Sequence, residues 1–169
     1  MLNRVFDNDT ICAIATPHGM GAIAVIRISG PEAISIVSQL FMQNDKPFDK
    51  SKMVANKAYY GHIVDHGDML DEVLVTFFKA PHSFTGEDSA EISVHGSVFV
   101  QQKLLQVLIA HGCRMAEAGE FTRRAFVNRK FDLTQAEAIA DLISSESEAA
   151  HRVAINQLKG GFFEQPEFF

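Results

Sequence analysis

The chain has 169 residues, which is enough for one domain plus an additional element. Its composition, 47% hydrophobic and 21% charged, is that of a folded protein rather than a disordered one. The formal net charge is −6, from 15 Lys and Arg against 21 Asp and Glu. This balance argues against a broad phosphate-binding surface, because such a surface is normally basic.

The cysteine pattern and the first residues bear on the cellular compartment. Cys12 and Cys113 lie far apart without a CxxC pair, which predicts reduced thiols in a cytosolic protein. The opening segment MLNRVFDNDT is polar and lacks the apolar region of a secretory signal. No stretch approaches the roughly 20 apolar residues that a membrane helix needs. We therefore expect a soluble, cytoplasmic protein with no membrane partner.

The first part of the chain predicts two strands and a helix. Residues 10–16 and 22–30 are β-rich and are joined by the turn PHGMG. The second run is apolar on both faces, like a central strand, except for Arg27. Pro31 then opens a helix, since its missing N–H costs nothing in the first turn. Apolar residues recur at helical spacing as far as Phe41.

Three more strands are predicted in the middle of the chain. Residues 56–64 and 72–80 flank a hairpin-like connection rich in Asp and Gly. Residues 80–88 form a loop, and SAEISVHGS follows at residues 89–97. Its small and aliphatic residues alternate with Ser, Glu and His, which predicts a strand with one apolar and one polar face.

Residues 97–112 have the spacing of a helix that ends at Gly112. We expect its inward face to consist of Val98, Leu104, Leu105, Leu108 and Ile109. The segment CRMA that follows predicts a short last strand.

The last part of the chain predicts helices. Residues 118–130, AGEFTRRAFVNRK, indicate a short helix or turn. Asp132 precedes Gln135 in the pattern of a capping box. From there, apolar residues follow one stripe to Leu158, which predicts a single helix of roughly 26 residues, about 39 Å long. Such a helix cannot bury its stripe alone, so we expect it to pack against another chain or against residues outside this sequence.

The chain ends in GGFFEQPEFF, in which Gly160 and Gly161 are expected to stop the helix before four Phe residues. This ending indicates a truncated protein. We therefore predict an α+β fold, a mixed β-sheet with flanking helices over residues 1–120. A long helix then begins a helical domain over residues 121–169.

Arg27 is the first candidate functional residue. Its guanidinium requires a partner, because burying an unpaired charge costs several kcal/mol. One interpretation is an edge position or an internal ion pair. The other is an anchor for an anionic ligand, which suits the planar fork of Arg. The residues alone favour neither interpretation.

Glu91 and His95 share the polar face of the strand at residues 89–97. The residues alone favour a solvated outer face. The alternative is a pocket in which Glu91 accepts hydrogen bonds from N–H groups of a heterocycle, with support from Ser93. A direct salt bridge between Arg27 and Glu91 is a third possibility.

Other chemistries find little support. PHGMG joins two strands, whereas a phosphate loop needs a following helix, and no G-x-x-x-x-G-K-[ST] segment occurs. The seven histidines lack metal-ligand spacing, and no catalytic triad can be inferred, so we expect neither a metal site nor a catalytic residue. One basic run is either a solvated helix surface or a small patch for an anionic tail or RNA. It consists of Arg123, Arg124, Arg129 and Lys130.

Four stretches, in order and spacing, resemble the MnmE family of tRNA-modification GTPases, also called TrmE. They are TPHGMGAIAVIRISG, SFTGEDSAEISVHGS, AGEFTRRAFVNRKFDLTQAEAIADLI and NQLKGGF. The resemblance covers the chain to about Phe162. Four residues depart from those usual in the family, namely His18, Met20, Ser97 and Arg129.

The resemblance implies a domain similar to the tetrahydrofolate-binding domain of the glycine-cleavage aminomethyltransferase. In the family this domain binds formyl-tetrahydrofolate and dimerises. A helical domain follows, with a potassium-dependent GTPase domain inserted in it, so GTP, potassium and magnesium would belong to the full-length protein only. With MnmG, an FAD- and NADH-dependent partner, family members modify C5 of the wobble uridine of certain tRNAs.

The family's folate-contacting residues correspond to Arg27 in VIRISG, Glu91 in SAEISVHG and Lys130 in NRKFDL. Glu91 would accept hydrogen bonds from the pterin amino and ring N–H groups. Arg27 and Lys130 would meet carboxylate or carbonyl oxygens elsewhere on the ligand. The main hypothesis is thus a folate-binding and dimerisation module that is inactive as a GTPase by itself. Its rivals are a stand-alone folate-dependent aminomethyl transferase and a purely structural dimerisation domain.

Overall fold

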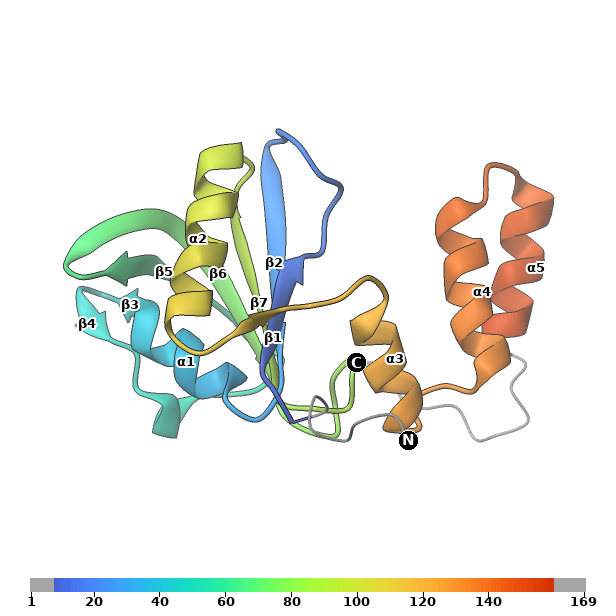
Figure 1. The fold of residues 1–169 in the computed structure, drawn as a ribbon, viewed down its shortest axis with the longest axis horizontal. Helices are drawn as coiled ribbons and strands as arrows, with labels where there is room; N and C mark the ends of the chain where they lie inside the picture. Colours follow the sequence, from blue (N-terminus) through green and yellow to red (C-terminus); the bar gives the residue numbers. More distant parts are fainter. Residues whose placement is uncertain (1–7, 160–169) are drawn as a thin grey trace.

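The fold is a β-sheet with helices packed on one face and a further group of helices to one side (Figure 1). A computed structural model describes residues 8–159. The strands are β1 (Ile11–Ile14), β2 (Ile23–Ser29), β3 (Phe41–Gln43), β4 (Lys46–Pro47), β5 (Ala58–Asp65), β6 (Asp68–Phe78), β7 (Ser89–His95) and β8 (Arg114–Met115). The helices are α1 (Ala33–Leu40), the 3₁₀ helix η1 (Lys50–Lys52), α2 (Val98–Ala110), α3 (Glu120–Val127), α4 (Leu133–Ser144) and α5 (Glu148–Lys159).

The strands form one sheet in the order β4-β3-β5-β6-β7-β2-β1-β8. The pair β1–β8 is parallel and the other pairs are antiparallel, so the predicted α+β class with a mixed sheet is confirmed. Strand β2 lies between β1 and β7. The interpretation of Arg27 as an edge residue is therefore wrong, because this side chain belongs to an interior strand.

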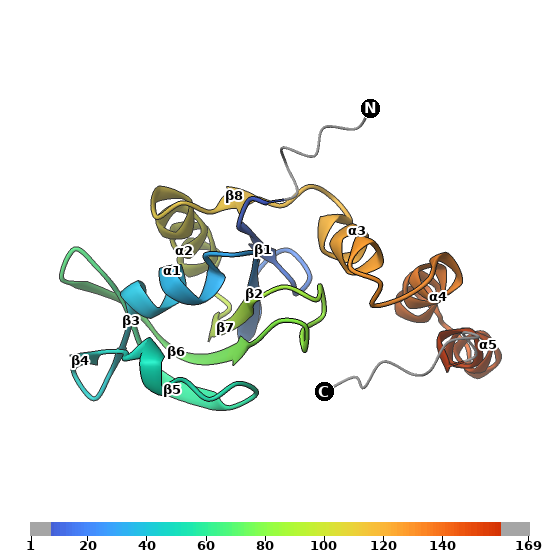
Figure 2. The same ribbon diagram turned by 90° about the horizontal axis from the view of Figure 1, so that it is seen from below.

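Strand β7 has the alternation that the sequence predicts. Ala90, Ile92 and Val94 are at most 3% exposed and belong to the main hydrophobic core. Glu91 is partly exposed and His95 is exposed on the other face. Helices α1 and α2 lie together on the apolar face of the sheet (Figure 2). The polar side chains of β7 consequently point to the face that these two helices leave open.

The β5–β6 hairpin is longer than the sequence suggests. Strand β6 begins at Asp68, whereas we expected a connection as far as residue 71. The turn needs only His66 and Gly67, whose φ angles are 49° and 85°. Positive φ at both central positions gives the turn type that matches the twist of paired strands. The extra paired residues include a register shift after Ile63.

Helix α2 buries a face that matches the prediction only in part. Leu104 and Leu108 are buried as expected, but Val98 and Ile109 are 45% and 43% exposed. Gln101 is buried instead, because its Nε2 donates to the carbonyl oxygens of Gly19 and Gly96 at 3.1 Å each. Both bonds fasten the helix to the β1–β2 turn and to the end of β7. A polar residue therefore occupies a position where spacing alone predicts an apolar one.

The single helix predicted after Asp132 is wrong, because the structure has the hairpin α4–α5 in its place. The two helices pack on each other, with Ala138 fully buried and Ala154 1% exposed. Part of the predicted apolar stripe stays uncovered, since Ile143 and Val153 are 81% and 57% exposed, so its packing against another chain or further residues stays a prediction. An open groove of about 470 Å³ remains between the helices. It is lined by Asp141, Ser144, Ser145, Glu146, Ala149, Ala150, Val153, Ala154 and Gln157.

Serine side chains explain the break between α4 and α5. Ser145 adopts an extended conformation, and its Oγ donates to the carbonyl oxygen of Leu142 at 2.8 Å. Ser147 accepts a hydrogen bond from the backbone N–H of Ala150 at 3.1 Å, as a helix cap does. Both serines thus offer the backbone partners that compete with a continuous helix. The capping box of Asp132 and Gln135 at the start of α4 is confirmed.

Two remaining sequence predictions concern the end of the chain and membrane-spanning helices. The predicted stop at Gly160 and Gly161 and the Phe-rich ending lie outside the described residues. Within residues 8–159, no helix combines the length and the apolar character that crossing a bilayer requires.

Candidate functional site

Arg27 and Glu91 form an ion pair across β2 and β7. The two residues are directly opposite each other in the antiparallel register. Nε of Arg27 donates to Oε1 of Glu91 at 3.0 Å, and Nη2 lies 2.9 Å from the same oxygen. The side chains remain 24% and 31% exposed. The third possibility, a direct salt bridge, is confirmed.

The pair retains atoms with which a ligand can bond. Across the described part of the chain, neither Nη1 of Arg27 nor Oε2 of Glu91 has a hydrogen-bond partner. A guanidinium has five N–H donors, and a carboxylate has lone pairs on both oxygens. The ion pair therefore keeps one donor group and one acceptor oxygen for a ligand without having to separate.

Two aromatic rings flank the guanidinium of Arg27. Its Cζ lies 4.7 Å from the ring centroid of Phe84 and 5.6 Å from that of Phe121. Phe84 belongs to the loop at residues 79–88, between β6 and β7, and Phe121 belongs to the first turn of α3. A cation over an aromatic face is stabilised electrostatically by the ring. Arg27 is thus held by one carboxylate and by rings from two separate elements.

Lys130 lies against the same loop. Its Nζ donates to the carbonyl oxygen of Pro81 at 3.0 Å, and its aliphatic carbons lie 3.4 Å from the position that a Cβ on Gly86 would occupy. The next residue, Phe131, has its ring centroid 5.5 Å from that of Phe84. In residues 8–159, Lys130 forms no hydrogen bond or ion pair with Arg27 or Glu91. The loop at residues 79–88 thus contacts both Arg27 and Lys130.

His95 is engaged elsewhere. Its Nδ1 lies 2.7 Å from Oδ1 of Asp71, and this hydrogen bond raises the pKa of the imidazole above its ordinary value. His95 shares a sheet face with Glu91 but pairs with a different strand. Among the described residues, no three side chains of His, Cys, Asp or Glu gather in a way that could hold a metal ion.

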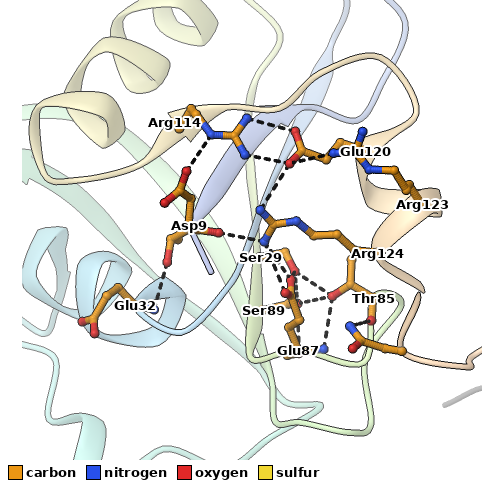
Figure 3. Close-up of polar contacts among 12 residues, drawn as sticks. Asp9, Ser29, Glu32, Thr85, Glu87, Ser89, Arg114, Glu120, Arg123 and Arg124 are labelled. Carbon is orange, nitrogen blue, oxygen red and sulfur yellow. Dashed lines mark hydrogen bonds and ion pairs between the residues drawn. The ribbon is translucent and has the colours of Figure 1, made fainter. Parts of the chain in front are cut away.

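Next to the site is a buried ion network that the sequence did not reveal (Figure 3). The carboxylate of Glu120, in α3, is fully buried. Nη1 and Nη2 of Arg114 donate to its two oxygens at 3.1 and 2.7 Å, and the backbone N–H of Glu117 donates to Oε2 at 2.8 Å. Arg114 also pairs with Asp9 through Nε at 3.1 Å. The pair of Arg114 and Glu120 is thus bidentate, which is the strong form of an arginine–carboxylate pair.

Arg124 extends the network into the sheet. It is 3% exposed, and its Nη1 donates to the carbonyl oxygen of Asp9 at 2.7 Å and lies 3.2 Å from each carboxylate oxygen of Glu87. Its Nη2 donates to Glu120 at 3.2 Å. For Arg124, both interpretations of the basic run, a solvated surface and a patch for an anionic tail or RNA, are wrong. The sequence could not show this, because the partners of Arg124 are distributed from residue 9 to residue 120.

The network keeps its carboxylate ionised. Burial by itself raises the pKa of Glu120, but the hydrogen bonds from Arg114 and from the backbone of Glu117 outweigh burial and bring it to about 2. The hydrogen bonds to Glu120 likewise raise the pKa of Arg114 above its ordinary value. Both groups are therefore charged over the whole range in which the protein is expected to work.

A pH titration of stability tests this network. The pKa of Glu120 in the folded chain, about 2, lies below the ordinary 4.5, so its contribution is complete above pH 4.5 and is lost as the pH falls toward 2. Between pH 5 and pH 2, the unmutated chain should lose about 3 kcal/mol more unfolding free energy than Glu120→Gln. Urea denaturation followed by circular dichroism measures both. Equal losses in the two proteins would show that Glu120 is not held ionised by its partners.

Comparison with known proteins agrees with these features. A family model described as the N-terminus of the GTP-binding protein TrmE matches residues 10–130. This span includes the sheet, the loop at residues 79–88, and α3. Arg27, Glu91 and Lys130 all fall within it.

Curated relatives with the name tRNA modification GTPase MnmE match nearly the whole chain. The protein of Flavobacterium johnsoniae is 57% identical over 158 residues, which are 94% of this chain and 34% of that protein. Those of Porphyromonas gingivalis and Bacteroides thetaiotaomicron are 49% and 54% identical over 160 residues, covering 95% and 92% of this chain. The chain thus spans about a third of the length of these relatives. It belongs to the MnmE (TrmE) family and corresponds to the family's N-terminal region.

Proposed function

We propose that this chain is the formyl-tetrahydrofolate-binding and dimerisation module of a tRNA-modification GTPase. The observation that carries the proposal is the Arg27–Glu91 ion pair, partly exposed and flanked by Phe84 and Phe121. Lys130 supplies a second cation at the same loop. The likeness to the folate-binding domain of aminomethyltransferases belongs to the same proposal.

The chemistry of a reduced folate suits these groups. The pterin carries an amino group and ring N–H groups, which Oε2 of Glu91 can accept while Oε1 stays with Arg27. The faces of Phe84 and Phe121 can stack on a planar part of the ligand. The glutamate carboxylates and the carbonyl oxygens of the folate are suitable partners for Nη1 of Arg27 and for Lys130. Each recognised part of the ligand thus has a matching group around one loop.

The open face of the sheet supports dimerisation. Tyr60, Leu74 and Ser93 are directly paired across β5, β6 and β7 and therefore share a face with Glu91. Tyr60 and Leu74 are 57% and 47% exposed, and Ile23 of β2, on the same face, is 67% exposed. Large apolar side chains gathered on one exposed face are typical of an interaction surface. A second copy of the chain is the partner that we propose.

The activity of the longer protein is part of the proposal. The relatives bear the name of a tRNA-modifying GTPase, so we propose that the full-length protein binds GTP, potassium and magnesium and acts with the FAD-dependent MnmG on C5 of the wobble uridine of tRNA. This chain should not hydrolyse GTP alone. A tRNA substrate agrees with the cytoplasmic location expected from the sequence.

In the full-length protein, Glu91→Gln should abolish the modification while GTP hydrolysis continues. Mass spectrometry of tRNA nucleosides measures the modification. Unchanged modification would oppose the proposal.

Calorimetry with 5-formyl-tetrahydrofolate tests the site directly. Glu91→Gln removes the charge but keeps the size, so it should weaken binding at least about tenfold, since a charge-assisted hydrogen bond is lost. Glu72→Gln is the matched control, because Glu72 lies on the neighbouring strand β6 and is exposed. It should leave the dissociation constant unchanged.

Two outcomes of the calorimetry would contradict the proposal. They are the absence of heat with the unmutated dimeric chain, and equal affinities for the unmutated and Glu91→Gln proteins. Turnover of methylene-tetrahydrofolate with an amine acceptor would favour the stand-alone transferase instead. Dimers whose melting temperature does not respond to folate would favour a purely structural domain, because a ligand that binds only the native state must stabilise it.

Sedimentation velocity tests the dimer surface. Leu74→Glu places a charge on the open sheet face, and burying it in an interface is costly, so the dimer should dissociate. Val54→Glu is the control, since Val54 is 55% exposed but lies in a loop that precedes β5. A Leu74→Glu protein that remains dimeric, or an unmutated chain that is monomeric, would refute this surface.

A further inference from the structure

We infer that Glu87 and Arg124 are positioning residues for the proposed folate site, which they serve by fixing the two aromatic rings beside Arg27. The inference rests on the proposed function. It assigns a role to a buried ion pair that is separate from the Arg27–Glu91 pair. Its effect on a ligand must therefore pass through other side chains.

The two rings belong to elements that are separate in the chain. Phe84 lies in the loop at residues 79–88, and Phe121 lies in α3. Their spacing around the guanidinium, 4.7 and 5.6 Å from Cζ, depends on how the loop and the helix are joined. In the described part of the chain, no backbone hydrogen bond joins the loop at residues 79–88 to α3. Side chains must supply the connection.

Glu87 and Arg124 supply it. Glu87 lies in the same loop as Phe84, shortly after it in the chain. Arg124 lies one helical turn beyond Phe121 in α3. Both carboxylate oxygens of Glu87 lie 3.2 Å from Nη1 of Arg124. The side chains are 18% and 3% exposed, so water screens the pair weakly. Figure 3 shows these two side chains meeting between the loop and α3.

Glu87 also fastens this junction to the strand that carries Arg27. Oγ of Ser29 donates to Oε2 of Glu87 at 2.6 Å, and Ser29 is on the same strand face as Arg27. The hydroxyl of Thr85, fully buried, lies 2.6 Å from Oγ of Ser29. One carboxylate thereby joins the loop, the helix and β2, the three elements that surround the guanidinium.

A second, outer connection runs parallel to the first. Nδ2 of Asn128, at the end of α3, donates to the carbonyl oxygen of Thr85 at 2.8 Å. Asn128 is exposed, so its loss should leave the core intact. The loop and the helix are therefore joined twice, once by buried charges and once by a surface amide.

The test is a double-mutant cycle on the affinity for 5-formyl-tetrahydrofolate, measured by calorimetry in the dimeric chain. Glu87→Gln should raise the dissociation constant on the order of tenfold. In the Phe84→Ala background, the same change should have a smaller effect, because one of the two rings through which Glu87 acts is gone. A merely structural loss of stability would instead add to the effect of Phe84→Ala.

Two further variants complete the test. Glu117→Gln removes an exposed acid that pairs with Arg123 and should leave the affinity unchanged. Asn128→Ala weakens the outer connection at an exposed position and should raise the dissociation constant several-fold; it serves in place of Glu87→Gln if that protein does not fold.

The outcomes separate the two proposals. Folate binding by the unmutated chain with equal affinity in Glu87→Gln and Asn128→Ala would overturn the positioning role alone. Additive effects of Glu87→Gln and Phe84→Ala would overturn it as well. A dimeric unmutated chain that does not bind folate would overturn the proposed function and the positioning role with it.

Discussion

The ion pair between Arg27 and Glu91 is the interaction on which the functional account depends. The antiparallel register of β2 and β7 sets the two residues opposite each other on two interior strands of the sheet. A partly buried guanidinium needs partners around it, because burying an unpaired charge is costly. Here they are one carboxylate and the rings of Phe84 and Phe121. The pair is thus fixed in place while it still has atoms that can meet a ligand.

Buried charges, together with apolar contacts such as that of Phe131 with Phe84, attach the helical part to the sheet. The buried residues of α3 are Glu120, Arg124 and Ala125, whereas α1 buries mainly aliphatic side chains. Removing one member of such a network leaves the opposite charge buried, which typically costs about 3–5 kcal/mol. Phe121 lies in α3, and Lys130 follows this helix in the chain. The same charges that hold α3 in place therefore also set the shape of the proposed ligand site.

Patterns with a local cause could be read from the sequence. The two-residue period of β7 and the capping box at Asp132 depend on neighbours in the chain, and the structure has both. The break at Ser145 and Ser147 escaped prediction because the apolar stripe continues in phase across it, while hydroxyl groups supply competing hydrogen bonds. The Glu87–Arg124 pair escaped because only the folded chain brings these residues together. For Arg27 and Glu91, three interpretations stayed open, because the register of the two strands cannot be read from the residues alone.

Nuclear magnetic resonance of 5-formyl-tetrahydrofolate bound to the labelled chain tests the central claim most directly. The account predicts nuclear Overhauser contacts from the pteridine protons to the rings of Phe84 and Phe121, together with a shift of the Nε–H signal of Arg27. Saturating binding that leaves these signals unchanged, with contacts only to another region such as the groove between α4 and α5, would contradict it.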